Sequence, residues 1–93
     1  MNVLGEDLLD EFGTKHASAR PAIRRWLRIV KTVEWKNLIE VKSTFPSADY
    51  VKGYIVFDLG GNNFRAVTVA QFASGNLIIQ MVMTHAEYDK WKA

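Results

Sequence analysis

Two short clusters rich in glycine and asparagine most constrain how this chain can fold. They are Gly60-Gly61-Asn62-Asn63 and Ala73-Ser74-Gly75-Asn76, and each separates two runs of β-branched and apolar residues. Glycine and asparagine tolerate the positive φ angles of tight hairpins, so both clusters predict β-turns. The runs Tyr54–Leu59, Phe64–Phe72 and Leu77–Met83 are therefore expected to form a three-stranded antiparallel meander.

The residues before the meander have helical spacing. Apolar residues recur from residue 4 to residue 12, and Gly13 follows where this first helix is expected to end. A second helix is expected from about Ala19 to Thr32, after a link short enough to favour an antiparallel helical hairpin. Ser18 would be its N-cap, and Pro21 is tolerated in its first turn because the missing N–H is not needed there.

The segment between the hairpin and the meander is less regular. Residues 34–49 are expected to form a short helical turn and then a loop, since Pro46 stops a helix from continuing. The sequence also leaves open a brief strand at Met1–Val3. After the meander, Thr84 is a suitable N-cap for a short helix ending at Lys92, and Glu87 completes a capping box.

These elements predict an α+β fold. Its parts are an N-terminal helical hairpin, the three-stranded antiparallel meander and a short C-terminal helix, all in a single domain over residues 1–93. Cysteine is absent, which excludes thiol catalysis and a disulfide scaffold. Because no apolar stretch approaches membrane-spanning length, we expect a soluble, cytoplasmic protein with no membrane partner.

Charge is unevenly distributed along the chain. Residues 1–14 sum to −4, residues 43–93 sum to zero, and residues 15–42 sum to +6, from eight basic residues less Glu34 and Glu40. A clustered basic face raises the local concentration of phosphate-bearing partners. Alternatively, the acidic first helix packs beside the basic second helix and their charges compensate each other.

An arginine and a histidine could share one surface of the small sheet. Arg65 begins the middle strand, and an arginine can meet a phosphate with two parallel N–H donors. His85 follows the last strand, and histidine exchanges protons near neutral pH. The alternatives are a surface salt bridge from Arg65 to Glu87 or Asp89, and a helix-start histidine bonded to backbone.

Four segments together resemble the HigB family of bacterial toxins, and their order and spacing match over nearly the whole chain. They are Trp35-Lys36-Asn37, Val41–Ala48, Val56–Arg65 and Thr84–Asp89. The resemblance implies a RelE-like fold and an mRNA interferase without a cofactor that cleaves messenger RNA, typically on ribosomes. It also implies silencing by a HigA-type antitoxin with a helix-turn-helix domain. The alternative function is a noncatalytic RNA- or protein-binding module of an operon-encoded complex.

The resemblance and the chemistry together give candidate residues. Arg65, His85 and Tyr88 are the candidate catalytic residues, although Tyr88 could equally pack in the core. Lys36, Lys42 and Asn62 are candidate RNA contacts, with solvated lysines and a plain turn residue as the alternatives. A basic stripe on the second helix is expected to contact the antitoxin or the ribosome; it comprises Arg20, Arg24, Arg28 and Lys31.

No metal site is expected. His85, Glu87 and Asp89 alternate in sequence, but successive helical positions diverge by about 100°, so the three side chains would not converge on one ion.

Overall fold

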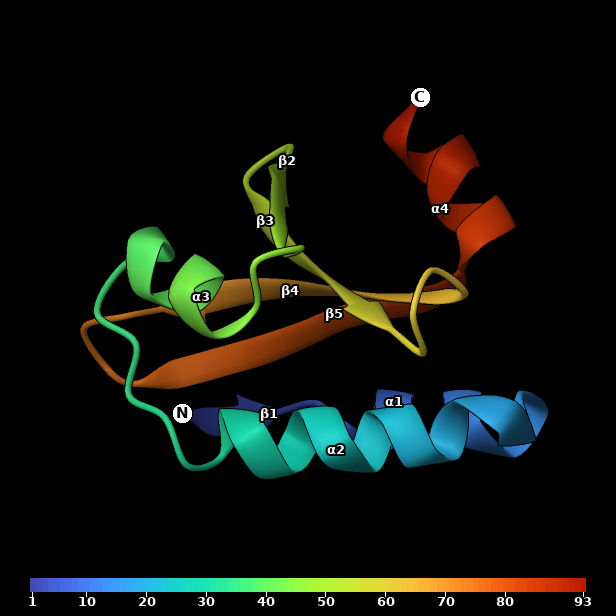
Figure 1. Cartoon of the computed structure of the whole chain (residues 1–93), viewed down its shortest axis with the longest axis horizontal. Coiled ribbons are helices and arrows are strands. Elements are labelled where there is room, and N and C mark those ends of the chain that lie inside the picture. Colours follow the sequence, from blue (N-terminus) through green and yellow to red (C-terminus); the bar gives the residue numbers. More distant parts are fainter.

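A five-stranded mixed sheet organises the chain in the computed structural model, which describes residues 1–93 (Figure 1). The strands are β1 (Asn2–Leu4), β2 (Asp49–Val51), β3 (Tyr54–Leu59), β4 (Phe64–Gln71) and β5 (Asn76–Thr84). The helices are α1 (Glu6–Lys15), α2 (Arg20–Val30), α3 (Leu38–Thr44) and α4 (His85–Lys92), with a 3-10 turn η1 (Ala17–Ala19) before α2. The strand order across the sheet is β1-β5-β4-β3-β2.

The predicted meander is confirmed. β3, β4 and β5 are antiparallel neighbours, and their register aligns Asp58, Arg65 and Met83 across the three strands. Both predicted turns use glycine at positive φ, at Gly60 (61°) and Gly75 (73°) among others. The turns therefore fix which residues face each other at the end of the sheet where α4 begins.

The two outer strands extend the sheet beyond the predicted meander. β1 confirms the brief N-terminal strand and pairs in parallel with β5. β2 was not predicted: the expected loop over residues 34–49 is wrong at its end, where Asp49–Val51 pairs with β3. The connecting turn is Lys52-Gly53, with φ angles of 55° and 87°. Lysine is uncommon at positive φ, and this hairpin lacked the cluster of glycine and asparagine that marks the other two turns.

The helical hairpin is confirmed, but the predicted end of its first helix and the predicted N-cap of its second helix are wrong. α1 continues through Gly13 to Lys15, and the Gly13 carbonyl instead accepts a hydrogen bond from Arg20 Nε at 2.9 Å. A Cβ at Gly13 would lie 3.2 Å from Arg20 Cγ, so the close approach of the two helices explains this glycine. α2 begins after Ala19, and Ser18 makes no capping bond; Pro21 does lie in the first turn.

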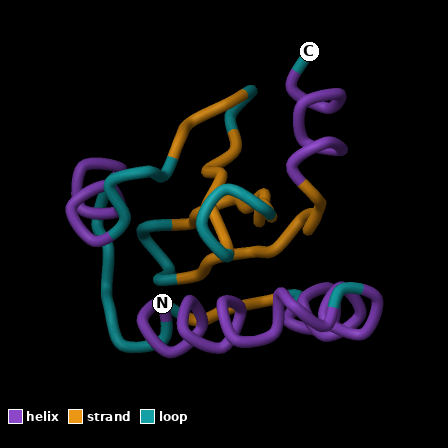
Figure 2. The backbone as a smooth tube through the Cα atoms, turned by 45° about the vertical axis from the view of Figure 1, so that its right-hand side comes forward, coloured by secondary structure: helices purple, strands orange, loops and turns teal.

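Buried side chains form two clusters on opposite faces of the sheet. The larger cluster joins α1 and α2 to the sheet face that carries Phe57 and Ala66. The smaller one lies under α4 and contains Val56, Val67, Met83 and Tyr88. Figure 2 shows α1 and α2 together on one side of the strands, with α4 rising from the far end of β5. The smaller cluster is thus the base on which α4 is positioned.

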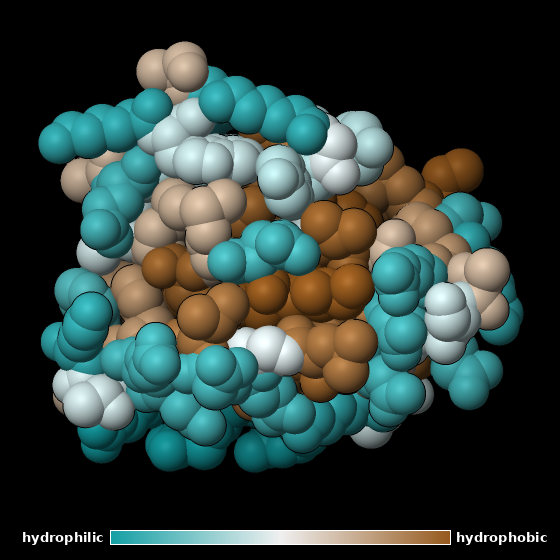
Figure 3. Space-filling model, turned by 180° about the vertical axis from the view of Figure 1, so that it is seen from behind, coloured by the Kyte–Doolittle hydropathy of each residue, from teal (hydrophilic) through white to brown (hydrophobic).

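The surface has one broad apolar area on its rear side, bordered by hydrophilic residues (Figure 3). No helix of the chain has the length and apolar character that crossing a membrane requires.

Candidate active site

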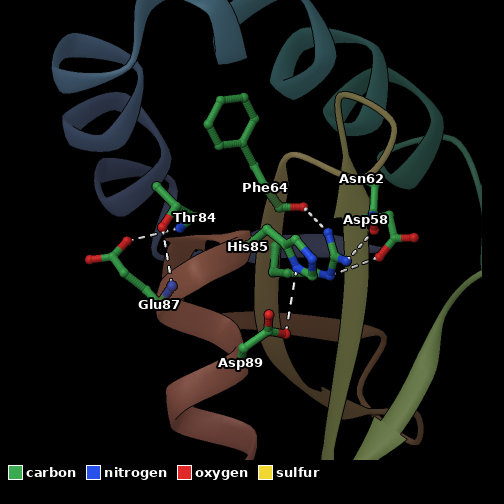
Figure 4. A network of polar contacts seen from close by, with 8 residues as sticks. Asp58, Asn62, Phe64, Thr84, His85, Glu87 and Asp89 are labelled. Carbon is green, nitrogen blue, oxygen red and sulfur yellow. Dashed lines mark hydrogen bonds and ion pairs between the residues drawn. The ribbon is translucent and has the colours of Figure 1, made fainter.

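Arg65 is almost completely enclosed by groups of its own hairpin. Its Nε lies 3.1 Å from Asp58 Oδ1, its Nη1 donates to the Phe64 carbonyl at 3.0 Å, and its Nη2 donates to Asn62 Oδ1 at 2.5 Å (Figure 4). The side chain is 7% exposed. The expected ion pair with Glu87 or Asp89 is therefore wrong: the partner is Asp58, directly opposite Arg65 in the register of β3 and β4.

The enclosed guanidinium still has donors to offer. A guanidinium carries five N–H groups, and the two hydrogen bonds occupy one on Nη1 and one on Nη2, while Nε forms the ion pair with Asp58. One N–H on Nη1 and one on Nη2 therefore remain without a partner. An anion that reached the guanidinium could accept both, while Asp58 and Asn62 keep the group in place.

Tyr88 lies against Arg65 from α4. The Arg65 guanidinium carbon is 5.2 Å from the Tyr88 ring centroid. The Trp91 ring stacks on the Tyr88 ring, with 5.9 Å between the two centroids. Because Tyr88 is only 5% exposed, it packs in the core, as one alternative expected. Burial first, and then the nearby charge of Asp49, raise the Tyr88 pKa above its ordinary value of 10.0. The phenol is therefore protonated near neutral pH, so it can donate a hydrogen bond but cannot act as a base there.

His85 begins α4 on the same side of the sheet. Its backbone N–H donates to the Asn63 carbonyl at 2.9 Å, and its Nδ1 lies 3.6 Å from Asp89 Oδ1, one helical turn on. The imidazole is 46% exposed, so it is accessible to a substrate. His85 follows Met83 by two residues, and Met83 is the register partner of Arg65. Residues two apart in an extended strand lie on the same face.

One turn therefore holds both main candidates. Asn62 contacts the side chain of Arg65, and its neighbour Asn63 contacts the backbone of His85. The structure thus brings Arg65, His85 and Tyr88 together at the end of the sheet where α4 begins, as expected. This arrangement places a guanidinium cation, a protonated phenol and an imidazole at one end of the sheet.

Sequence reasoning did not pair Asp58 with Arg65 or Asp89 with His85. Asp58 could have been found by pairing residues symmetrically about the turn, because Asp58 and Arg65 are equidistant from its centre. Asp89 could have been found from its spacing of four from His85 on a helix. Each lies beside one candidate catalytic side chain, so each can orient it.

Glu87 points away from these groups. It accepts from the Thr84 backbone N–H at 2.8 Å, while its own N–H donates to Thr84 Oγ1 at 3.2 Å, which confirms the predicted capping box. Figure 4 shows Glu87 on the opposite side of α4 from Asp89. The hydrogen bonds from Thr84, and then the positive charges of His16 and Lys15, lower the Glu87 pKa below its ordinary value of 4.5.

The two candidate lysines lie elsewhere. Lys36 lines an open cleft of about 460 Å³ together with the β4–β5 turn, at the far end of β4 from Arg65. Lys42 is exposed on α3, and Figure 1 shows α3 and α4 on opposite sides of the molecule. The structure therefore does not bring Lys36 or Lys42 together with Arg65 and His85.

The basic stripe on α2 divides into two pairs. Arg20 bonds to Gly13, and Lys31 forms an ion pair with Glu6 at 3.0 Å, so these two connect α2 to α1. Arg24 and Arg28 are exposed and form no ion pair. Compensation by the acidic first helix is thus only partial, and two cations remain for a partner.

Comparisons with known proteins support a common origin for most of the chain. Residues 19–91 match the HigB_toxin family model, described as the RelE-like toxic component of a toxin-antitoxin system. The chain is 27% identical over 93 residues to the mRNA interferase HigB of Escherichia coli O6:H1, which covers 97% of this chain and 90% of that protein. It is 43% identical over 62 residues to the mRNA interferase toxin HigB of Escherichia coli K12, covering 63% of this chain and 60% of that protein.

Proposed function

Because the chain belongs to the HigB family of RelE-like toxins, we propose that it is an mRNA interferase, an endoribonuclease that cleaves messenger RNA and inhibits translation. The observation that supports this most is the single turn, Asn62-Asn63, that holds both Arg65 and His85. Similar proteins named mRNA interferase in Escherichia coli add to this support.

The proposed reaction uses the substrate's own 2′-hydroxyl as the nucleophile. Its oxygen attacks the adjacent phosphorus, its proton leaves to a base, and the bond from phosphorus to the 5′-oxygen breaks as that oxygen gains a proton. The products are a 2′,3′-cyclic phosphate and a 5′-hydroxyl. The protein has to move protons and stabilise the negative charge that builds on the phosphate oxygens.

The site residues divide these tasks. The two free N–H groups of Arg65 stabilise the phosphate oxygens, and Asp58 and Asn62 hold the guanidinium for this purpose. His85 transfers a proton, and Asp89 orients its imidazole. The protonated Tyr88 hydroxyl has no hydrogen bond within the chain and can donate to the phosphate.

RNA contacts outside the reacting phosphate follow from the positions of the other candidates. The Asn62 carbonyl oxygen is taken by Arg65, so only its NH₂ group can contact a nucleotide. Lys36 and Lys42 lie far from His85, so they would bind phosphates of more distant nucleotides or of ribosomal RNA. We propose that cleavage occurs on the ribosome and that a HigA-type helix-turn-helix antitoxin neutralises the toxin.

Analysis of the RNA ends tests the function. Messenger RNA is incubated with the purified protein, with and without translating ribosomes, and the fragment ends are determined. The proposal predicts 2′,3′-cyclic phosphate and 5′-hydroxyl ends. Fragments with 5′-phosphate ends would indicate attack by water instead. Salt-dependent RNA binding without cleavage in either condition would favour the noncatalytic binding module.

A further inference from the structure

A small groove separates α2 from the β3–β4 turn, next to the candidate active site but on the α2 side of the hairpin. Its volume is about 220 Å³, and it is lined by Arg25, Trp26 and Ile29 on α2 and by Asp58 and Gly60-Gly61 on the other side. Gly60 comes close to α2, since a Cβ there would lie 3.7 Å from the Ala22 Cβ. The groove is therefore narrow where Gly60 faces α2.

Three side chains that line the groove lack an interaction partner within the chain. Ile29 is 40% exposed, although it lies on a helix whose other apolar residues are largely covered. Arg25 is exposed and forms no ion pair or hydrogen bond. Trp26 is 2% exposed, and its indole Nε1 is a buried donor with no acceptor. Buried donors are nearly always paired, so Trp26 contributes an unpaired donor to this part of α2, although Nε1 itself is not exposed to the groove.

We propose that this groove binds an extended segment of the antitoxin that carries an apolar side chain beside a carboxylate. The apolar side chain covers Ile29, and the carboxylate pairs with Arg25. This inference rests on the proposed function, because it assumes a toxin with an inhibitory protein partner.

The chemistry of the groove favours a peptide over RNA. Asp58 forms part of one wall, where its carboxylate can accept a hydrogen bond from a peptide main-chain N–H, a donor that a phosphate backbone does not have. Ile29 offers no flat face for stacking on a base. The exposed arginines Arg24 and Arg28 lie near Arg25 on the same helix, so an acidic segment crossing α2 would meet further positive charge.

The position of the groove suits an inhibitor. Asp58 lines it and also pairs with Arg65 Nε. Gly61, on the same wall, directly precedes Asn62, which holds Arg65 Nη2. A segment seated there contacts the hairpin end that positions the proposed phosphate-binding cation.

Two groove variants and one matched control test the proposal. The groove variants are Ile29→Asp and Arg25→Glu, and the control is Leu4→Asp. Leu4 is 46% exposed against 40% for Ile29, but it lies on β1 at the edge of the sheet away from β3. The probe is the purified HigA-type antitoxin encoded with this toxin. Its Kd is measured for each full-length variant, alongside circular dichroism and the Kd for ribosomal RNA.

The proposal predicts that each groove variant binds the antitoxin about tenfold or more weakly, as for an anchor residue at an interface centre, while Leu4→Asp stays close to wild type. Normal antitoxin binding by both folded groove variants overturns it, and it does so without affecting the proposed function. The proposal is also overturned if the groove variants lose binding to ribosomal RNA but keep binding to the antitoxin, because RNA would then be the occupant of the groove. A wild-type chain that neither cleaves mRNA nor binds the antitoxin would contradict the groove and the proposed function together.

Discussion

The guanidinium of Arg65 lies over the ring of Tyr88, 5.2 Å from its centroid, and this contact connects β4 to α4 at the candidate active site. Its neighbours Val67 and Met83 belong to the buried cluster under α4. Arg65 is thus both the proposed phosphate ligand and a packing residue. Substitutions at either side chain are expected to affect stability as well as chemistry.

Arg65→Ala is expected to lower both stability and cleavage. It removes the partner of Asp58 and uncovers one side of Tyr88, which should cost about 2 kcal/mol of unfolding free energy. Loss of a phosphate-stabilising group is worth roughly 3 kcal/mol of barrier. Denaturant unfolding and single-turnover cleavage measure the two effects separately. Arg65→Lys keeps the positive charge but not the planar group of three nitrogens. Compared with Arg65→Ala, it should restore more of the unfolding free energy than of the cleavage rate. Wild-type cleavage by folded Arg65→Ala would remove Arg65 from the mechanism.

Tyr88→Phe separates packing from hydrogen bonding. The variant keeps the ring beneath Arg65 and removes only the hydroxyl, so its melting temperature should stay close to wild type. If the hydroxyl donates to the charged phosphate, the single-turnover rate should fall about tenfold or more. An unchanged rate would leave Tyr88 as a core residue only.

The capping box of α4 should weaken in acid. Glu87 has a folded-state pKa below 4.5, so its contribution to stability is complete above its unfolded-state pKa and is lost as the pH falls through the lower folded value. We expect Glu87→Ala to destabilise the chain at pH 7 and to have a smaller effect in acid below pH 4.5. Glu87→Gln, which can still accept from Thr84, should lose less at pH 7. Thermal melts at both pH values test this, and equal destabilisation by alanine at both would contradict it.

Reversing the charges of Arg24 and Arg28 should slow association with the antitoxin. These two exposed cations form no ion pair within the chain, so they are free to attract an acidic partner. The association rate should fall and its dependence on salt should weaken. Reversal of Lys36 and Lys42 changes the net charge equally on another side of the molecule and is the control. Equal slowing by both double variants would indicate a general effect of charge instead of a contact at α2.

The sequence predicts the centre of the sheet because its turn signals are strong. Gly60 and Gly75 occupy the positive φ angles that their clusters indicated, and the capping box at Thr84 formed as expected. β2 was missed because Lys52 adopts a positive φ that lysine seldom does. α1 was predicted too short because Gly13 is required for the approach of Arg20 and not for a helix end. Local patterns do not reveal such tertiary causes.

In the candidate site, too, local sequence predicts some features, while others depend on tertiary structure. Arg65 and His85 could be chosen from their chemistry, but the burial of Arg65 could not, because it depends on α4 folding back over β4. Lys36 and Lys42 are near Arg65 in neither space nor sequence, and their choice depended on the family resemblance and on the chemistry of lysine, neither of which fixes a position in the fold. Asp58 and Asp89 required a register and a helix phase, which the structure supplies.

The most direct test of the account is the pH dependence of single-turnover mRNA cleavage by His85→Gln, with wild type and His85→Ala beside it. Glutamine keeps much of the shape of histidine and one hydrogen bond but cannot transfer a proton. If His85 is the acid or base, both variants should be slower by about a hundredfold or more, and an ionisation seen in the wild-type profile should be absent from theirs. Cleavage by His85→Gln at close to the wild-type rate, with the same pH profile, would contradict the proposed role of His85.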